Sequence, residues 1–443
     1  MTATIRQAVV LCGGKGTRLG DIARAVPKPL IRVGGKPVLD HIIEVLARGG
    51  ITQVILAAGH LGHQIADYYH KPSHGCSIKT VIEETPSGTS GALNLLRDEL
   101  DEDFLLVYGD VFLDCDVAPL LQDHAQHRPM ATLLVRESDH PWDSDLIGLD
   151  SDSRVVEFVR HRVPARLYRN VANAAVYVLS RGILKFIPTD QPSDFGGDVF
   201  PAALAAGTML RAHWLAWSGM VKDMGTPKRK QEVEDYLDEK AIAANARSRP
   251  GTVKTVFVDR DGTLTREDGH LVRADRLDFL PGVPAAVARM TRAGIKIVVI
   301  TNQPVIARGM CSVEVLEAIH RRLCGEIEAA GGRIDAIYYC PHHPDTHHDE
   351  GVAELRRACR CRKPAPGLIF QAMREQQVDL SAAVMVGDRA LDVQAGRAAG
   401  VRTVLVGPRA QREPQAEICA PDAQFDSLLD FANALLSGGV FSR

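Results

Sequence analysis

Strand-like segments alternate with helix-like segments along both halves of the chain. In the first half, the runs that predict strands are Ala8–Cys12, Gln53–Ala57, Phe104–Tyr108, Thr132–Val135 and Ala174–Leu179. In the second half they are Val253–Val258, Ile295–Ile300, Ala383–Val386 and Thr403–Val406. This alternation predicts an α/β fold in which parallel or mostly parallel sheets are covered by helices.

A polar segment separates the two halves. Residues Pro227–Arg247 are rich in Lys, Glu and Ala, which predicts a helix, and a short linker ends at Pro250 and Gly251. Because a chain of 443 residues is too long for one ordinary hydrophobic core, we expect two domains, 1–240 and 252–443, with a linker at 241–251. No repeat links the halves, so they look like two different catalytic units.

Composition narrows the classes of function. A formal net charge of −3 argues against a general nucleic-acid binder or a protein that binds anionic membranes, so any phosphate-binding charge must be local. Nine cysteines in a chain of this length are not a disulfide scaffold. No apolar stretch reaches the roughly 18 residues that span a bilayer, and the first residues lead straight into a strand-like run. We therefore expect a cytoplasmic protein.

The first half opens with a strand that runs into a glycine-rich turn. The turn contains Gly13, Gly14 and Gly16, whose backbone N–H groups can approach phosphate oxygens closely. It is not a P-loop, because Lys15 is followed by glycine, and it lacks the spacing of a dinucleotide fingerprint. A tight turn without a ligand is the alternative. The segments Pro27-Lys28-Pro29-Leu30 and Pro86-Ser87-Gly88-Thr89-Ser90-Gly91-Ala92 follow in order.

Together these segments resemble the sugar-1-phosphate nucleotidyltransferase family, from about Gln7 to Leu237. The resemblance implies that a nucleoside triphosphate is held by Leu11, Gly13, Gly14, Gly16, Thr17 and Gly88. It implies that Arg18 and Lys28 neutralise phosphate charge while a sugar phosphate attacks the α-phosphorus. Asp110 and Asp223 match the two strand-end carboxylates of the family and would bind Mg²⁺.

Three positions bear on the substrates of this half. Asn173 begins a segment that resembles the one that holds the sugar, although Ala175 replaces its glycine. Arg160 stands near the place of a phosphate-binding lysine in many relatives; it either substitutes for that lysine or belongs to a solvated basic turn. Glu84, next to Glu83, could accept both N1–H and N2–H₂ of guanine, which favours GTP, but two exposed glutamates at a strand end explain the pair equally well.

The second half carries paired carboxylates at a strand end. Asp259-Arg260-Asp261-Gly262-Thr263-Leu264 follows the run Val253–Val258. One carboxylate with a second two residues on suits covalent phosphoryl transfer, in which the first attacks phosphorus and the second handles protons. Gly262 lets the chain turn sharply at this point.

Further elements follow in the order that a phosphoryl-enzyme mechanism needs. Thr301 ends a strand with a hydroxyl, Lys363 supplies positive charge, and Asp388 ends a later strand, with Asp392 one helical turn beyond. This order resembles the haloacid dehalogenase (HAD) superfamily, from about Val253 to Val406. The resemblance implies a Rossmann-like domain with Asp259 as nucleophile and Asp261 as acid and base. It implies a Mg²⁺ site made by Asp259, Asp261 and Asp388, oriented by Asp392.

A cysteine and histidine cluster narrows the resemblance. Cys340, His342, Cys359 and Cys361 form a three-sulfur, one-nitrogen set that can close a tetrahedral shell, which predicts a structural zinc site in a loop. The neighbours His343, His347 and His348 leave the choice of histidine open. With Thr301-Asn302-Gln303 and Arg308-Gly309, the cluster resembles the histidinol/heptose-bisphosphate phosphatase branch. That branch implies His342 as the ligand, and a substrate gripped by Asn302, Arg362 and Arg389.

The fusion itself favours one substrate. A phosphatase that converts a sugar 1,7-bisphosphate to the 1-phosphate makes what a nucleotidyltransferase consumes, whereas histidinol has no use for a nucleotide. We therefore expect dephosphorylation of D-glycero-D-manno-heptose 1,7-bisphosphate at C7, followed by nucleotidyl transfer, GTP being the favoured donor. The alternatives are the same chemistries on another sugar phosphate, or a phosphatase with an inactive, sugar-nucleotide-sensing first half. Such transferases often self-associate, but no strip of residues identifies an interface.

Overall fold

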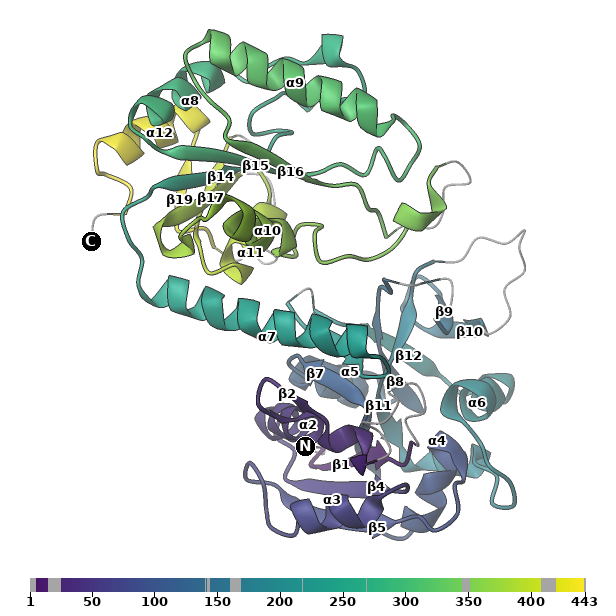
Figure 1. Cartoon of the computed structure of the whole chain (residues 1–443). Coiled ribbons are helices and arrows are strands. Elements are labelled where there is room, and N and C mark those ends of the chain that lie inside the picture. Colours follow the sequence, from purple (N-terminus) through teal and green to yellow (C-terminus); the bar gives the residue numbers. More distant parts are fainter. Residues whose placement is uncertain are drawn as a thin grey trace. The chain divides into compact units, whose positions relative to one another are not determined.

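The computed structural model of the chain describes residues 5–14, 25–139, 141, 144–159, 169–216, 218–267, 269–344, 351–407 and 420–441. The chain divides into two compact units, an N-terminal unit, Met1–Leu237, and a C-terminal unit, Asp238–Arg443 (Figure 1). Helix α7 (Pro227–Ser248) includes most of the predicted linker. The domain limits 1–240 and 252–443 stay a prediction.

The N-terminal unit is built on a mixed sheet. Its strands β6 (Asp103–Tyr108), β1 (Gln7–Cys12), β4 (Gln53–Ala58) and β5 (Ser77–Ile82) lie in this order and run parallel. On the β6 side, β11 (Ala172–Ser180) runs antiparallel to β6, and the remaining strands are β8 (Ala131–Arg136), β9 (Leu146–Leu149), β10 (Val155–Val159) and β12 (Leu210–Trp214). The mixed α/β architecture predicted for this half is confirmed.

The central strands are buried on both faces. Along β1, Ala8, Val10 and Cys12 enter one hydrophobic cluster and Val9 enters the other, as the two-residue period of a strand requires. Helix α2 (Val38–Arg48) covers the first face with side chains at helical spacing, among them Leu39, Ile42 and Leu46.

Shorter elements complete this unit. The helices are α3 (Gly62–Tyr68), α4 (Gly88–Gly91), α5 (Ala118–His127), α6 (Phe200–Ala205) and the short turns η2 (Lys28–Leu30), η3 (Ala92–Leu96), η4 (Arg181–Phe186) and η5 (Phe195–Val199). Two small antiparallel pairs are β2 (Arg32–Val33) with β3 (Lys36–Pro37), and β7 (Val111–Asp114) with β13 (Met220–Asp223).

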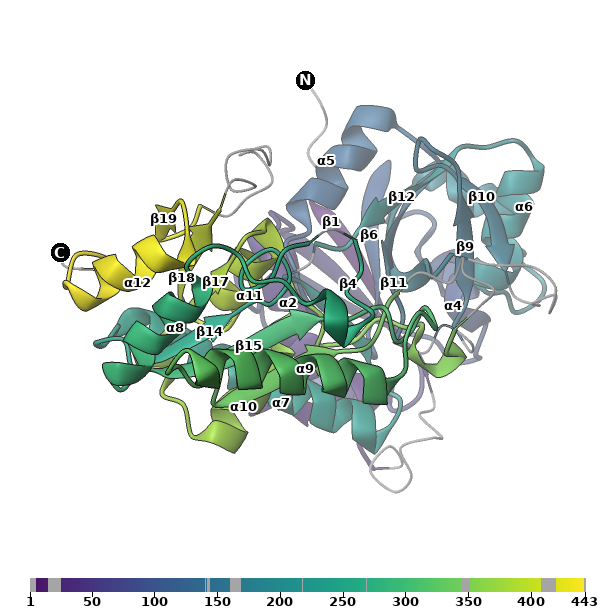
Figure 2. The ribbon, with the colours of Figure 1, turned by 90° about the horizontal axis from the view of Figure 1, so that it is seen from above.

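The C-terminal unit has a wholly parallel sheet. Its strand order is β16 (Ala336–Cys340), β15 (Lys296–Asn302), β14 (Thr255–Val258), β17 (Ala383–Gly387), β18 (Arg402–Val406) and β19 (Ala423–Phe425). Helices α8 (Val283–Arg292), α9 (Val313–Ala329) and α12 (Leu428–Leu436) gather on one face (Figure 2), and α10 (Gly367–Gln376) and α11 (Ala390–Ala398) on the other. The short turns are η6 (Ala274–Arg276), η7 (Ala353–Leu355) and η8 (Leu380–Ala382).

Every strand predicted from the sequence is present, with ends shifted by one or two residues, and the predicted helix extends to Ser248. Within the described ranges no helix combines the length and the apolar character needed to cross a membrane.

The second half of α7 packs into the C-terminal unit. Ala243 and Ala246 are buried in the cluster that contains α10 and α11. Gly400 has a positive φ of 74°, and a Cβ at this position would lie 2.0 Å from the carbonyl oxygen of Ala243. Only glycine lets the two backbones approach so closely.

Replacing Gly400 by alanine should therefore lower the free energy of unfolding by about 3 kcal/mol, the sum of left-handed backbone strain and a steric clash. Gly294 has φ +76° and nothing within 4 Å of a built Cβ, so Gly294→Ala should cost only about 1 kcal/mol. Urea unfolding of the full chain would compare them. Equal losses for the two variants would contradict the close approach.

Candidate active sites

The side chains predicted to be catalytic in the C-terminal unit gather where three neighbouring strands end. Asp259 follows β14, Thr301 and Asn302 end β15, and Asp388 follows β17. The carboxyl ends of parallel strands meet at one edge of a sheet, so these residues come together. The cavity at this edge is lined by seven of the predicted residues, Asp259, Asp261, Thr301, Asn302, Arg362, Lys363 and Arg389.

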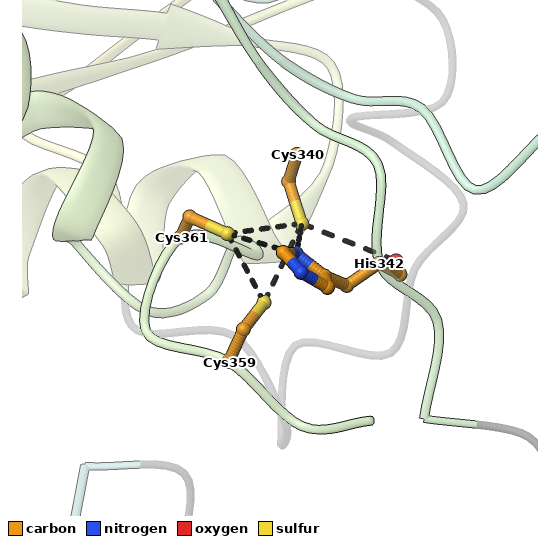
Figure 3. A group of neighbouring side chains, drawn as sticks. All are labelled: Cys340, His342, Cys359 and Cys361. Carbon is orange, nitrogen blue, oxygen red and sulfur yellow. Dashed lines mark hydrogen bonds between the residues drawn. The ribbon is translucent and has the colours of Figure 1, made fainter. Parts of the chain in front are cut away.

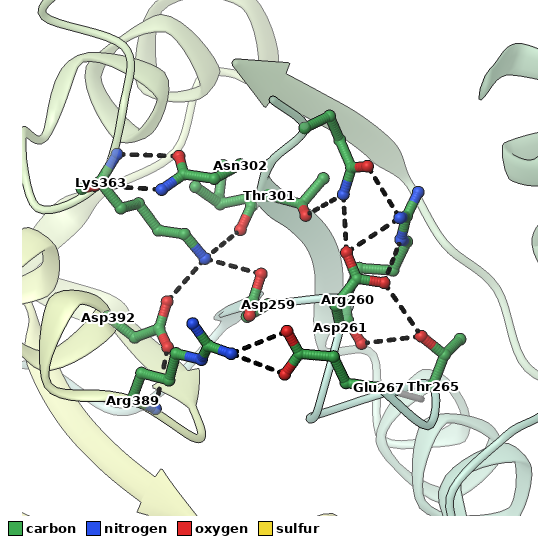
Figure 4. Close-up of polar contacts among 12 residues, drawn as sticks. Asp259, Arg260, Asp261, Thr265, Glu267, Thr301, Asn302, Lys363, Arg389 and Asp392 are labelled. Atoms are coloured by element: carbon green, nitrogen blue, oxygen red, sulfur yellow. Dashed lines mark hydrogen bonds and ion pairs between the residues drawn. The ribbon is translucent and has the colours of Figure 1, made fainter. Parts of the chain in front are cut away.

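Lys363 is the centre of this site (Figure 4). Its Nζ lies 2.7 Å from Asp259 Oδ1 and 2.6 Å from Asp392 Oδ1, and it donates to the Ile300 carbonyl at 2.8 Å. Burial would lower the pKa of Lys363, but the two carboxylates outweigh burial and raise it. Burial raises the pKa of Asp259 to about 7, with Lys363 opposing the rise. Lys363 therefore contacts two buried carboxylates, more negative charge than it can neutralise by itself.

The carboxylates are spaced for a metal ion. Oxygens of Asp259, Asp388 and Asp392, all buried, lie within 4.8 Å of one another. Gly262 is required beside them, because it has φ +84° and a Cβ there would lie 2.3 Å from an Asp388 oxygen. A set of buried carboxylates with a single lysine fits a hard divalent cation. The sequence assigned the third ligand to Asp261, and Asp392 was given an orienting role.

Asp261 is held by a buried arginine. Arg260, 1% exposed, donates from Nε and Nη2 to the two Asp261 oxygens at 2.9 Å, and Gln303 Nε2 donates to Asp261 at 2.7 Å. Burial would raise the pKa of Asp261, but Arg260 and Gln303 lower it overall. The carboxylate is thereby fixed in position and kept ionised. Gln303 belongs to the motif Thr301-Asn302-Gln303, but this contact is not predictable from the sequence.

The rim of the cavity is basic. Arg389 Nη2 donates to both oxygens of Glu267 at 2.7 Å, and Arg362 Nη1 donates to the His342 carbonyl at 3.3 Å. Arg308 also lines the cavity and donates to His270 Nε2 at 2.9 Å and to His343 Nε2 at 3.1 Å. The sequence analysis missed the cavity positions of Glu267 and Arg308; the Arg308-Gly309 motif was the available signal.

The four residues of the cysteine and histidine cluster converge on one another (Figure 3). The Sγ atoms of Cys340, Cys359 and Cys361 lie 3.2–3.5 Å apart, and His342 Nδ1 lies 3.3 Å from Cys361 Sγ. All four ligand atoms fall within 4.8 Å of one another, a set that fits a tetrahedral zinc ion. His343 instead contacts Arg308, and His347 and His348 lie outside the described residues.

The N-terminal unit has a second cavity at the glycine-rich turn. Six predicted residues line it, Leu11, Gly13, Gly14, Lys28, Gly88 and Asp110. Glu83 also lines the cavity and accepts from the Ser87 backbone N–H at 3.0 Å and from the Ser87 hydroxyl, whereas Glu84 is not among its lining residues. The position expected for Glu84 is thus taken by its neighbour. Gly16, Thr17, Arg18 and Arg160 lie outside the described residues.

Asp110 immediately precedes β7, and Asp223 ends the neighbouring strand β13. Asp223 is opposite Val111, and the Met224 N–H donates to the Asp110 carbonyl at 2.8 Å. Each carboxylate also contacts a cation: Lys28 Nζ lies 3.0 Å from Asp110, and Arg229 Nη1 lies 2.6 Å from both Asp223 oxygens. Carboxylate pairs of this kind suit Mg²⁺ held together with phosphate oxygens.

The predicted sugar-binding residue lies elsewhere. Asn173 is not among the residues that line the cavity; it donates to the Tyr177 hydroxyl at 2.7 Å and accepts from the Ala175 N–H at 2.9 Å. Ala175 has φ +57°, a region that favours glycine, which is the residue expected from the resemblance.

Comparison with known proteins agrees with both halves. Residues 7–237 match the family model described as nucleotidyl transferase, and residues 360–431 match a HAD-hydrolase-like model. A D-glycero-beta-D-manno-heptose-1,7-bisphosphate 7-phosphatase from Yersinia pestis is 37% identical over 187 residues, which cover 42% of this chain and 96% of that protein. Its counterpart from Escherichia coli K12 is 37% identical over 185 residues, 42% of this chain and 94% of that protein.

The chain belongs to the nucleotidyl transferases and to the HAD-like phosphatases. It is accordingly a bifunctional enzyme. Solved structures that match include HddC from Yersinia pseudotuberculosis complexed with GMP-PN, with a TM-score of 0.45, 23% identity, and coverage of 53% of this chain and 100% of that chain. Another is the D,D-heptose 1,7-bisphosphate phosphatase from B. bronchiseptica, with a TM-score of 0.37, 34% identity, and coverage of 42% of this chain and 99% of that chain.

A neutral histidine supports the HAD-like site from behind. His320 on α9 is 8% exposed, and its Nε2 accepts from Arg260 Nη1 at 3.1 Å. Burial, together with the nearby Arg260 charge, lowers the pKa of His320 to about 4. The folded state therefore binds fewer protons than the unfolded state between about pH 4 and pH 6.5, so acidification through this range destabilises the fold.

We expect His320 to account for a loss of about 2 kcal/mol in the free energy of unfolding between pH 7 and pH 5. His320→Gln keeps an acceptor for Arg260 and removes the titration, so its loss over the same range should be smaller by about that amount. Denaturant unfolding at both pH values would measure it, with the exposed His270→Gln as control. An unchanged pH dependence in His320→Gln would contradict this assignment.

Proposed function

We propose that the enzyme catalyses two consecutive steps of nucleotide-activated heptose synthesis. The C-terminal unit removes the C7 phosphate of D-glycero-D-manno-heptose 1,7-bisphosphate. The N-terminal unit then transfers a nucleotidyl group, GMP from GTP, to the heptose 1-phosphate and releases pyrophosphate. Both reactions are assigned to the cytoplasm, and self-association of the transferase unit is compatible with them.

One observation carries this proposal: phosphatases named for heptose 1,7-bisphosphate match the second half over nearly their whole length, and this half is fused to a nucleotidyl transferase. Removal of the 7-phosphate leaves the phosphate at C1. A phosphate at C1 is the nucleophile that a sugar-phosphate nucleotidyltransferase needs. Adjacent steps on one chain explain the fusion more simply than unrelated activities do.

In the phosphatase reaction, Asp259 attacks phosphorus and forms an aspartyl phosphate, and the C7 oxygen leaves. Lys363, 2.7 Å from Asp259, offsets the charge of the transferred phosphoryl group together with the Thr301 hydroxyl. Asp261 protonates the leaving oxygen and then takes a proton from the water that hydrolyses the aspartyl phosphate. Its lowered pKa favours the second of these roles.

HAD phosphatases generally use Mg²⁺, which would neutralise phosphate charge here. Asp259 and Asp388, together with the backbone carbonyl of Asp261, would hold the ion, and the proximity of Asp392 to this set supports a share for it. Zn²⁺ held by Cys340, His342, Cys359 and Cys361 would brace the loop that presents Arg362 and Lys363.

Selectivity for a bisphosphate is assigned to the basic rim. Arg362 and Arg389 would grip the phosphate that is not removed, and Arg308 is added to them because it lines the same cavity. Arg389 would have to exchange Glu267 for phosphate oxygens. Asn302 is assigned to substrate binding. Its side chain also donates to and accepts from the Lys363 backbone at 3.0 Å, and this pair of hydrogen bonds holds Lys363 in place.

In the transferase reaction, the turn at Gly13, Gly14, Gly16 and Thr17, with Leu11 and Gly88, would hold the nucleotide. Arg18 and Lys28 would neutralise the triphosphate while an oxygen of the sugar phosphate attacks the α-phosphorus. Mg²⁺ would stabilise the pyrophosphate leaving group and would be held by Asp110 and Asp223. Arg160 and Asn173 remain assigned to the sugar phosphate.

Two alternatives keep part of this assignment. The same chemistries could act on another sugar phosphate, which comparative rates across sugar bisphosphates would decide. The N-terminal unit could instead sense a sugar nucleotide without transferring it. The carboxylates Asp110 and Asp223, each contacting a cation, favour a working transferase.

The purified full chain, given heptose 1,7-bisphosphate, Mg²⁺ and GTP, should release one phosphate and form a GDP-linked heptose, measured by phosphate and pyrophosphate assays.

Asp259→Asn should lower phosphate release at least about a thousandfold and leave transfer to heptose 1-phosphate intact. Asp223→Asn should lower transfer at least about a hundredfold and spare phosphate release. Turnover of histidinol phosphate alone would overturn the proposal, and unchanged transfer in Asp223→Asn would remove Asp223 as a metal ligand.

The base preference should depend on Glu83, which lines the nucleotide cavity and could accept the N1–H and N2–H₂ groups of guanine. Glu83→Gln should lower kcat/KM for GTP by about tenfold to a hundredfold, because one acceptor is replaced by a donor. Glu84→Gln is the matched control and should change little. Rates with GTP, ATP, CTP and UTP would measure the preference, and an equal loss with all four would argue against base recognition by Glu83.

A further inference from the structure

A buried carboxylate of the C-terminal unit lies outside both cavities. Glu239 is 8% exposed and belongs to α7, within the unit that begins at Asp238. The phosphatase resemblance begins only at Val253, so no motif of that family includes it. A buried acidic side chain requires partners that offset its desolvation.

Two arginines supply these partners. Arg360 Nη2 donates to Glu239 Oε2, and Arg374 Nη1 donates to Glu239 Oε1 at 3.1 Å. Arg360 stands between the clustered Cys359 and Cys361, and Arg374 lies on α10. Each carboxylate oxygen thus receives a charge-assisted hydrogen bond from a different element.

The helix that presents Glu239 is itself fixed on this unit. Ala243 and Ala246 are buried in the core, and Gly400 admits the Ala243 backbone. Arg247 donates to the two Asp422 oxygens at 2.8 and 3.1 Å and to the Val401 carbonyl at 3.2 Å. Glu239 is therefore an anchor point for the cysteine loop rather than a side chain on a loose linker.

The anchored segment leads directly into the active site. The Arg360 carbonyl accepts from the Gly367 N–H at 2.9 Å, which ties the segment to the start of α10. Lys363 is also fixed from the opposite side, by Asp259, Asp392 and the Ile300 carbonyl. Arg362 lies at the cavity rim and takes its position from the segment between Arg360 and Lys363.

We propose that Glu239 is a positioning residue for the phosphatase reaction: by holding Arg360 it sets the place of Arg362 and so the affinity for the second phosphate. This inference rests on the proposed bisphosphatase function. The side chains of Arg360 and Arg374 are 41% and 57% exposed, so their ion pairs with Glu239 contribute little to overall stability. The effect therefore falls on geometry at the rim.

The test compares two substrates in the full-length enzyme. Glu239→Gln keeps the shape of the side chain and removes its charge. We expect KM for the heptose bisphosphate to rise about tenfold, with kcat changed by less than about twofold. With p-nitrophenyl phosphate, which has no second phosphate, kcat/KM should stay the same. Asp238→Asn removes the same charge from the adjacent exposed position and should leave both substrates unaffected.

A second variant changes the other residue of the ion pair, which lies in the cysteine loop. Arg360→Gln should give the same rise in KM. The double variant should show no further rise, because both changes break the same interaction, the ion pair between Glu239 and Arg360. Unchanged KM values, or equal losses with both substrates, would overturn the positioning role. Absence of bisphosphatase activity in the wild-type enzyme would instead refute the proposed function, so the two failures are distinguishable.

Discussion

The active site of the C-terminal unit depends on one buried lysine. Lys363 contacts Asp259 from the end of β14, Asp392 from α11 and the Ile300 carbonyl from β15. Burial raises the pKa of Asp259, and Lys363 opposes that rise and so favours the ionised carboxylate. The register of the parallel strands therefore sets the spacing of charge, and the excess of carboxylates over lysine makes the place suited to a divalent cation.

In the N-terminal unit, carboxylates also lie beside cations, but they come from different structural elements. Its carboxylates are Asp110, just before β7, and Asp223, at the end of the antiparallel partner β13. Each contacts its own cation, Lys28 for Asp110 and Arg229 for Asp223. Gly13 and Gly14, which follow β1, line the cavity with backbone rather than side chains. The positive charge of Lys28 and Arg229 is thus local, in a protein whose formal net charge is −3.

The sequence predicted the position of a site residue wherever that residue directly follows a buried strand. Asp259, Thr301 and Asp388 come at the ends of apolar runs, so their meeting followed from the parallel sheet. The sequence was less informative where a shift of one residue changes the side to which a side chain points. Strand β5 ends at Ile82, and adjacent residues in an extended chain point to opposite sides. Glu83 therefore reaches the cavity and Glu84 does not. Glu267 and Arg308 lie in loops whose paths no periodicity encodes.

Helix α7 shows why a connecting segment can look like a linker. Its buried apolar residues belong to different cores: Val233 packs in the core of the N-terminal unit, and the small side chains Ala243 and Ala246 pack in that of the C-terminal unit. No single apolar stripe runs along the helix, so the pattern reads as solvated. Glu239 adds to this impression, because its partner Arg360 is 121 residues away in the chain. A charged residue in a polar helix is recognised as structural only when the fold brings its counter-ions to it. Here one counter-ion, Arg374, lies on α10, and the other, Arg360, belongs to the loop that leads into the phosphatase site.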